Sequence, residues 1–234
     1  MKAGILAAGR GERLRDSGEL KPLVQVAGRP LITHVLRAFS AIEIDEVAVI
    51  INEDSERVRG VVMAENWPFS IRWIVKTTQS SMHSFLRLLE HLSAENGGNR
   101  FLIATVDTVL DPKQLVAFTN AASPHRDSAV TLAINEPADD DNPLWVTSDE
   151  AGCVRGFGDP TSKRATAGVY IVDAVVLREA KGAERDRLMS LRNFLGRLLE
   201  RDYKISAVSI GNSIDVDRSA DIIAAEKLLK QHQI

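Results

Sequence analysis

Short apolar runs alternate with amphipathic segments between residues 3 and 122. Apolar runs with the character of buried strands cover residues 3–6, 46–51, 71–75 and 100–106. Apolar residues at helical spacing follow each run, over residues 30–39, 56–65, 80–94 and 113–122. A strand followed by a helix, repeated along the chain, predicts a parallel sheet that is covered on both faces and binds its ligands at the carboxyl ends of the strands.

The remainder of the chain continues this α/β pattern with one interruption. We expect further strands over residues 128–134, 166–172 and 204–210, and helices over 187–201 and 218–231. Residues 136–142 form an acidic loop bracketed by prolines, and residues 144–157 have the pattern of a short hairpin. No repeat, low-complexity tract or linker divides the sequence. We therefore predict a single domain over residues 1–234, with residues 136–170 as an insertion that forms a small substrate-side lobe.

Composition narrows the classes of protein to which the chain can belong. It has 234 residues, of which 44% are hydrophobic, so it is long enough for one sizeable core. A net charge of −3 argues against a surface that binds nucleic acid. The single cysteine, Cys153, excludes a disulfide framework and is typical of a reducing compartment. No apolar run reaches spanning length and the apolar start is too short for a signal peptide, so we expect a cytoplasmic protein without a membrane partner.

A glycine-rich loop with the sequence Leu-Ala-Ala-Gly-Arg-Gly follows the first strand, over residues 6–11. Gly9 and Gly11 permit positive φ and close approach of the backbone, so successive amides can turn inward on an anion such as a triphosphate. Three basic side chains add positive charge around the loop: Arg10, Arg13 and Lys21. These residues outline a phosphate-binding site.

The loop differs from the two commonest phosphate-binding motifs. A Walker loop requires Lys-Ser or Lys-Thr directly after Gly9, and a dinucleotide fingerprint requires a third glycine where Leu14 stands. Instead, Leu-Ala-Ala-Gly-x-Gly-x-Arg-Leu is followed by Lys-Pro-Leu from Lys21 and Gly-x-Pro-Leu from Gly28. This combination resembles the signature of the sugar-1-phosphate nucleotidyltransferases, within the MobA-like NTP transferase superfamily.

The resemblance implies a Rossmann-like three-layer α/β sandwich with a mostly parallel central sheet. It also implies Mg²⁺-dependent transfer of a nucleoside monophosphate from a nucleoside triphosphate to a sugar 1-phosphate, with release of pyrophosphate. Lys21 and Arg13 would be catalytic, and the loop at residues 77–84 would recognise the base. The nucleotide-binding residues that it implies are Leu6, Ala7, Ala8, Gly9, Arg10, Gly11, Arg13, Lys21, Thr78, Ser80 and Ser81.

Three aspartates are candidates for holding the metal. Asp107 follows an apolar strand, where an aspartate often only begins a turn, but beside a triphosphate cradle Mg²⁺ requires a carboxylate. The resemblance assigns the metal to an aspartate at this place. Asp215 and Asp217 precede the last helix, and alternation places both on one side of an extended segment. We prefer Asp217 as the second ligand and Asp215 after it, with helix capping as the alternative role of Asp217.

The acceptor is the part of the reaction that the sequence specifies least. Residues 149–170 resemble the family segment that lines the sugar pocket, and we predict acceptor contacts from Gly168 and Tyr170. The lysine that normally precedes the proline of this segment is absent before Pro160, and Lys163 or Arg164 would have to replace its charge. Alternative acceptors are phosphocholine, another phosphorylated alcohol, or the pterin of molybdenum cofactor. A nucleotide-binding regulator without turnover is the alternative of another class, disfavoured by the retained lysine and aspartates.

Overall fold

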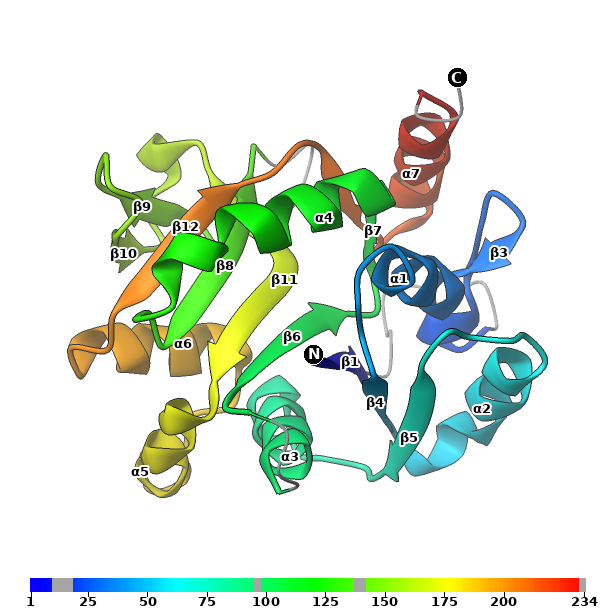
Figure 1. Ribbon diagram of the computed structural model, residues 1–234, viewed down its shortest axis with the longest axis horizontal. Helices are drawn as coiled ribbons and strands as arrows, with labels where there is room; N and C mark the ends of the chain where they lie inside the picture. The colour runs from blue at the N-terminus through cyan, green and yellow to red at the C-terminus, as the bar shows by residue number, and fades with distance from the viewer. Residues whose placement is uncertain (10–18, 95–97, 137–141, 232–234) are drawn as a thin grey trace.

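A seven-stranded sheet forms the centre of the molecule, and the computed structural model describes residues 1–9, 19–94, 98–136 and 142–231. The strand order is β12-β8-β11-β6-β1-β4-β5 (Figure 1). The strands are β1 (Lys2–Ala7), β4 (Glu46–Ile51), β5 (Ser70–Val75), β6 (Arg100–Thr105), β8 (Val130–Asn135), β11 (Ala165–Asp173) and β12 (Ile205–Ser209). β11 is antiparallel to both of its neighbours, whereas the other pairs are parallel. The predicted mostly parallel sheet is confirmed.

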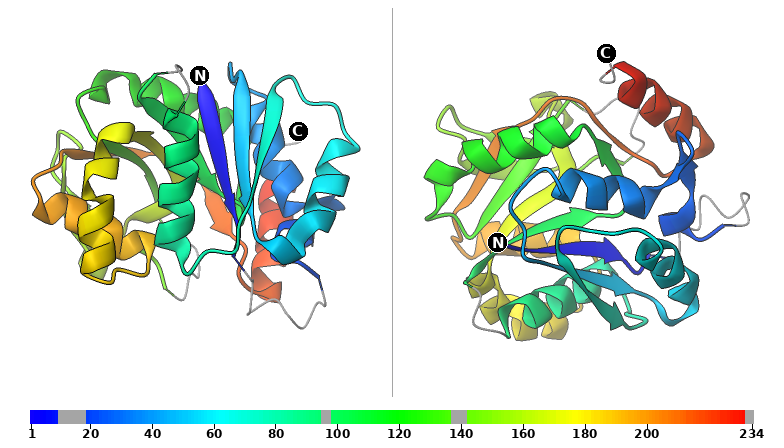
Figure 2. Two further views of the ribbon diagram at one scale, coloured as in Figure 1. Left: turned by 90° about the horizontal axis from the view of Figure 1, so that it is seen from below. Right: turned by 45° about the vertical axis from the view of Figure 1, so that its right-hand side comes forward.

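Helices cover both faces of the sheet (Figure 2). One face packs against α1 (Leu31–Phe39), α2 (Glu56–Met63) and α4 (Pro112–Ala121). The other packs against α3 (Ser81–Ser93), α5 (Ala180–Arg185) and α6 (Leu191–Glu200). Alternating residues of β1 serve the two layers: Ile5 belongs to the first core, and Leu6 packs against the second. A Cβ at Gly4 would lie 2.8 Å from Leu88, so glycine lets α3 approach β1 closely.

Three pairs of short strands lie outside the central sheet. They are β2 (Gln25–Val26) with β3 (Arg29–Pro30), β7 (Thr108–Leu110) with β13 (Ser213–Asp215), and β9 (Val146–Ser148) with β10 (Val154–Phe157). The β9–β10 pair confirms the predicted hairpin. Residues 165–170, which we included in the insertion, instead begin β11 inside the central sheet. The final helix, α7 (Ser219–Gln231), packs beside β2 and β13.

The largest difference from the predicted elements lies between residues 174 and 190. A 3₁₀ helix, Ala174–Glu179, and α5 occupy a stretch where we predicted no helix. The helix predicted from residue 187 begins only at Leu191, because Arg187 has a φ of +56° and Ser190 caps the helix with its hydroxyl. Within the described ranges, no helix combines the length and apolar character that crossing a membrane requires.

Candidate active site

A cavity of about 850 Å³ opens where β1, β4, β5 and β6 end. Carboxyl ends of parallel strands gather at one edge of a sheet, which is where open α/β sheets bind ligands. The segment after β1 contributes Ala8 and Gly9, and Asn52 follows β4. The side-chain Nδ2 of Asn52 donates to the backbone carbonyl of Ala8 at 3.4 Å and so links the ends of these two strands. The cavity therefore lies at the edge of the sheet where we predicted the site.

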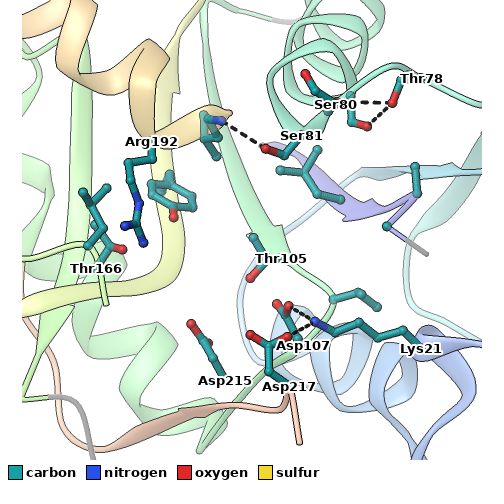
Figure 3. Close-up of a pocket in the computed structure, with 18 of the residues that line it drawn as sticks. Lys21, Thr78, Ser80, Ser81, Thr105, Asp107, Thr166, Arg192, Asp215 and Asp217 are labelled. Atoms are coloured by element: carbon teal, nitrogen blue, oxygen red, sulfur yellow. Dashed lines mark hydrogen bonds and ion pairs between the residues drawn. The ribbon is translucent and has the colours of Figure 1, made fainter. Parts of the chain in front are cut away.

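Lys21 lies between two carboxylates on the floor of the cavity (Figure 3). Its Nζ atom is 2.5 Å from Asp107 Oδ2 and 2.5 Å from Asp217 Oδ1. Lys21 begins the 3₁₀ helix Lys21–Leu23, whose Pro22 and Leu23 are buried and anchor the segment. The side chains of Lys21 and Asp107 are 11% and 22% exposed, whereas that of Asp217 is 39% exposed, so this ion triad is sheltered around Lys21 and open to solvent at Asp217.

A short antiparallel pair brings the distant aspartates to this place. Asp215 of β13 stands opposite Thr108 of β7, and the amide of Val216 donates to the carbonyl of Asp107 at 3.0 Å. Asp221 fixes the turn that follows, because its Oδ2 atom accepts from the amides of Asp217 and Arg218 at 3.0 and 2.7 Å. Asp107, Asp215 and Asp217 all line the cavity, as predicted.

A chain of hydrogen bonds links the hydroxyls of Thr105 and Thr108 to the carboxylate of Asp215. Thr105 Oγ1 and Thr108 Oγ1 are 2.8 Å apart, and Thr108 donates to Asp215 Oδ1 at 2.8 Å. Gly168 makes this arrangement possible, since a Cβ there would lie 1.8 Å from Thr108 Oγ1 and the glycine has a φ of +66°. Gly168 is buried in β11 and does not line the cavity, so its role is to leave room for the hydroxyls.

The charges of the triad stabilise one another. Burial alone lowers the pKa of Lys21, but the carboxylates of Asp107 and Asp217 outweigh this effect and hold that pKa above its ordinary value. Burial raises the pKa of Asp107, yet the ammonium of Lys21 more than compensates, so the net shift in that pKa is downward. Near neutral pH, Lys21 is positive and Asp107 is negative.

The donor set of the triad suits a small divalent cation. Among the residues that the structure describes, no group of three or more His, Cys, Asp or Glu side chains is arranged to hold a metal ion alone. Mg²⁺, however, is usually bound by one or two carboxylates, with substrate phosphates and water as its other ligands. Asp107 and Asp217 already converge on one cation, the ammonium of Lys21, so these two carboxylates fit such an ion.

The predicted base-recognition loop lies on one wall of the cavity. Thr78, Ser80 and Ser81 all line it. Ser80 caps α3, and its hydroxyl lies 2.8 Å from His83 Nδ1. His83 therefore forms a local hydrogen bond at the start of α3. The hydroxyl of Ser81 accepts from the amide of Leu191 at 3.1 Å. This bond joins the amino-terminal ends of α3 and α6 at the rim of the cavity.

The opposite wall holds residues that the sequence pattern did not reveal. Thr166 and Arg192 lie side by side on this wall (Figure 3), and Asn142 and the predicted Tyr170 also line the cavity. Burial, and next to it the charge of Asp215, raises the pKa of the Tyr170 hydroxyl above its ordinary value, so this hydroxyl stays protonated. Arg192 was missed because an arginine on an amphipathic helix resembles any solvent-facing residue.

The predicted site residues and the two candidates for the missing lysine divide into four groups. Those that line the cavity are Leu6, Ala8, Gly9, Lys21, Thr78, Ser80, Ser81, Asp107, Tyr170, Asp215 and Asp217. Ala7 is buried in β1 and, like Gly168, does not line the cavity. Arg10, Gly11 and Arg13 lie outside the described residues. Lys163 and Arg164, the candidates for the missing lysine, are exposed and do not line the cavity.

Comparison with known families identifies the family of the chain. The profile of the MobA-like NTP transferase domain matches residues 3–171, which include β1, Lys21, Asp107 and Tyr170. The chain belongs to this family. The matched range ends before Asp215 and Asp217, which line the same cavity.

Two curated relatives match the NTP transferase domain over nearly all of its length. A CMP-5'-(3-aminopropyl)phosphonate synthase of Streptomyces rubellomurinus is 27% identical over 220 residues, which are 90% of this chain and 33% of the relative. A bifunctional IPC transferase and DIPP synthase of Rubrobacter xylanophilus is 26% identical over 235 residues, 97% of this chain and 51% of the relative. The chain thus spans about half or less of the length of these relatives.

A solved structure confirms the fold of the NTP transferase domain. The inositol-1-phosphate CTP transferase of T. maritima superposes with a TM-score of 0.81 at 17% sequence identity, covering 99% of this chain and 96% of that one. At this identity the likeness concerns the fold alone. It agrees with the predicted Rossmann-like arrangement of layers.

Proposed function

We propose that the chain transfers a nucleoside monophosphate from a nucleoside triphosphate to a phosphorylated acceptor and releases pyrophosphate. The observation that carries the proposal is the contact of Lys21 with Asp107 and Asp217, at the strand ends where the glycine loop also begins. The acceptor that we propose first is a sugar 1-phosphate, with a phosphorylated alcohol as the alternative. Mg²⁺ is the proposed cofactor, and the single cysteine favours the cytoplasm as the compartment.

In this proposal an oxygen of the acceptor phosphate attacks the α-phosphorus of the nucleotide. The new P–O bond forms as the bond to the bridging α–β oxygen breaks, and pyrophosphate leaves with the electron pair. No general base is needed, because the acceptor phosphate is already ionised near neutral pH. The protein therefore contributes positioning and charge neutralisation.

The roles of the residues follow from their charges. The ammonium of Lys21 offsets negative charge that develops at the α-phosphoryl group. Asp107 and Asp217 would hold Mg²⁺, which when bound would neutralise phosphate charge as a Lewis acid. Asp215, whose carboxylate accepts a hydrogen bond from Thr108, is the alternative to Asp217 as the second ligand. Thr78, Ser80 and Ser81 form the wall that we assign to the base.

Pyrophosphate release with Mg²⁺ tests the proposal directly. The nucleoside triphosphates, beginning with CTP because the Streptomyces relative carries CMP in its name, are crossed against sugar 1-phosphates, phosphocholine, alkyl phosphonates and other phosphorylated alcohols. We expect release that requires one acceptor and one base. If no acceptor supports release while a triphosphate still raises the melting temperature, the chain acts as a nucleotide-binding regulator instead.

A further inference from the structure

The acceptor side of the cavity contains one basic residue that the proposed function does not use. Among the described residues that line the cavity, the cationic side chains are those of Lys21 and Arg192. Lys21 is engaged by two carboxylates, whereas the ion pairs of the described residues include none of Arg192. Arg192 extends from the start of α6 toward Thr166, on the side of the cavity away from Lys21 (Figure 3).

Arg192 is held in place by a tether that leaves most of its donors available. Its Nη1 atom donates to Asn142 Oδ1 at 2.9 Å, and its Nη2 atom donates to the Asn142 carbonyl at 2.5 Å. A guanidinium has five N–H donors, so three remain without a partner in the described part of the chain. A half-buried guanidinium that is oriented by neutral oxygens keeps its full charge for a ligand, because no carboxylate of the described residues forms an ion pair with it.

The surroundings of Arg192 distinguish the acceptor from the triphosphate as its ligand. Thr166 lies beside Arg192 (Figure 3), and the charge of Arg192 acts on the Tyr170 hydroxyl, whereas Gly9 follows the end of β1. The Ser81–Leu191 hydrogen bond fixes the start of α6, and with it Arg192, at the rim. An anion at this wall also lies near the amino-terminal end of a ten-residue helix, which favours negative charge.

We infer that Arg192 binds the phosphate or phosphonate group of the acceptor, in place of the lysine that is missing before Pro160. The inference rests on the proposed function, because it assigns the cation that positions the attacking group. It selects acceptors whose phosphate or phosphonate group offers two free oxygens for a two-pronged contact with a guanidinium. Lys163 and Arg164 are excluded from this role by their positions outside the cavity.

Steady-state kinetics of Arg192→Gln with the active donor and acceptor tests this assignment. We expect the KM of the acceptor to rise about 10- to 100-fold, the factor for losing hydrogen bonds between charged groups, while the KM of the triphosphate changes less than about twofold. Arg192→Lys should recover part of the loss. The control Arg59→Gln, on the exposed side of α2, should leave both constants unchanged. An unchanged acceptor KM in Arg192→Gln, or an equal rise in both constants, would overturn the inference, as would the same acceptor defect in Arg164→Gln.

A calorimetric titration with inorganic phosphate, in the absence of nucleotide, separates this inference from the proposed function. Wild-type protein should bind phosphate at a site that Arg192→Gln weakens about 10-fold or more. If phosphate binds only at the glycine loop, wild-type protein and Arg192→Gln will have the same affinity for phosphate, and the assignment will be contradicted. Absence of pyrophosphate release by wild-type protein with every acceptor would defeat the proposed function, whereas turnover with an Arg192-independent acceptor KM would defeat only the inference.

Discussion

Lys21 neutralises two carboxylates that would otherwise repel each other in a sheltered cavity. Both contacts are 2.5 Å long, and the two aspartates come from segments more than one hundred positions apart in the sequence. The same ammonium is suited to stabilise negative charge on a phosphoryl group. Substitutions of Lys21 and Asp107 can therefore separate the contribution of this ion triad to turnover from its contribution to folding.

Lys21→Ala should lower kcat about 10²- to 10³-fold, the scale for losing one preorganised electrostatic group. The KM of the triphosphate should change much less, because charge on the α-phosphoryl group develops mainly during transfer. Rapid-quench or steady-state pyrophosphate assays measure both constants. Lys163→Ala removes an exposed lysine outside the cavity and serves as the matched control. A kcat within fivefold of wild type would remove Lys21 from the mechanism.

Asp107→Asn should change how stability depends on pH. The pKa of Asp107 is lowered in the folded protein, so its charge contributes stability that is present above the unfolded value of about 3.8 and is lost as pH falls through the folded value. The pKa of Lys21 is raised, so its contribution is complete below about 10.5. The difference in free energy of unfolding between wild type and Asp107→Asn should be flat from pH 5 to 9.

Below about pH 4 the same difference should shrink, because Asp107 becomes protonated in wild-type protein and then resembles asparagine. Urea denaturation at several pH values measures it. A difference that persists unchanged to pH 2 would show that the ion triad is not its source.

At the scale of elements, three strands depend on one glycine. β7, β11 and β13 meet where Gly168 leaves room for Thr105 and Thr108, which in turn position Asp215. The register of β11 against β8 is irregular between Thr166 and Tyr170, around this glycine. The irregularity and the positive φ together let β11 pass the hydroxyls without a clash.

Gly168→Ala should destabilise the protein by at least about 2 kcal/mol, since overpacking adds to the strain of a positive φ. Gly156→Ala, at a position where a Cβ meets no atom within 4 Å, should change stability by less than about 0.5 kcal/mol. Chemical denaturation of both variants measures the contrast. Equal effects would mean that the approach of Thr108 to β11 is not tight.

The elements that could be predicted are those with strong periodicity. β4 matches its predicted range of residues 46–51, and α1 to α4 lie within about two residues of their predicted limits. β7 and β13 were missed because three-residue strands have no pattern of their own and exist through pairing across the chain. α5 was missed because Gly182 interrupts a short, mixed segment, where the glycine makes room for the Arg197 side chain.

The residues of the candidate site that could be predicted are those that belong to recognisable sequence motifs. Lys21, Asp107 and the Asp215–Asp217 pair follow recognisable motifs, and the sheet topology brings them together. Arg192 and Asn142 follow none, because they meet only in the folded chain, through the hydrogen bonds between them. Gly168 was predicted as an acceptor contact, but its importance lies in the packing of hydroxyls that only the three-dimensional arrangement reveals.

At the scale of the whole molecule, the cavity joins the two halves of the sheet. Its walls come from β1, β4 and β5 on one side and from β11 and α6 on the other. A triphosphate with Mg²⁺ should therefore stabilise the protein as a unit. At one hundred times the dissociation constant, we expect about 2.7 kcal/mol, or about 5–10 °C in melting temperature for a chain of this length.

Differential scanning fluorimetry with CTP and the other triphosphates, with and without Mg²⁺, measures this stabilisation. Asp107→Asn combined with Asp217→Asn should abolish the part that depends on Mg²⁺. Asp149→Asn, which alters a half-buried carboxylate of the hairpin outside the cavity, should retain it. If the double variant responds to Mg²⁺ as wild type does, the metal is held elsewhere.

The antiparallel orientation of β11 has a consequence for how this architecture diversifies. The last residue of β8, Asn135, is paired with the first residue of β11, Ala165, so the chain leaves the sheet and returns to it at a single point. The intervening residues can lengthen, shorten or be exchanged without any new crossover. A chimera that receives this stretch from a relative should thus keep the central sheet intact, which makes Asn135 and Ala165 natural junctions for grafting.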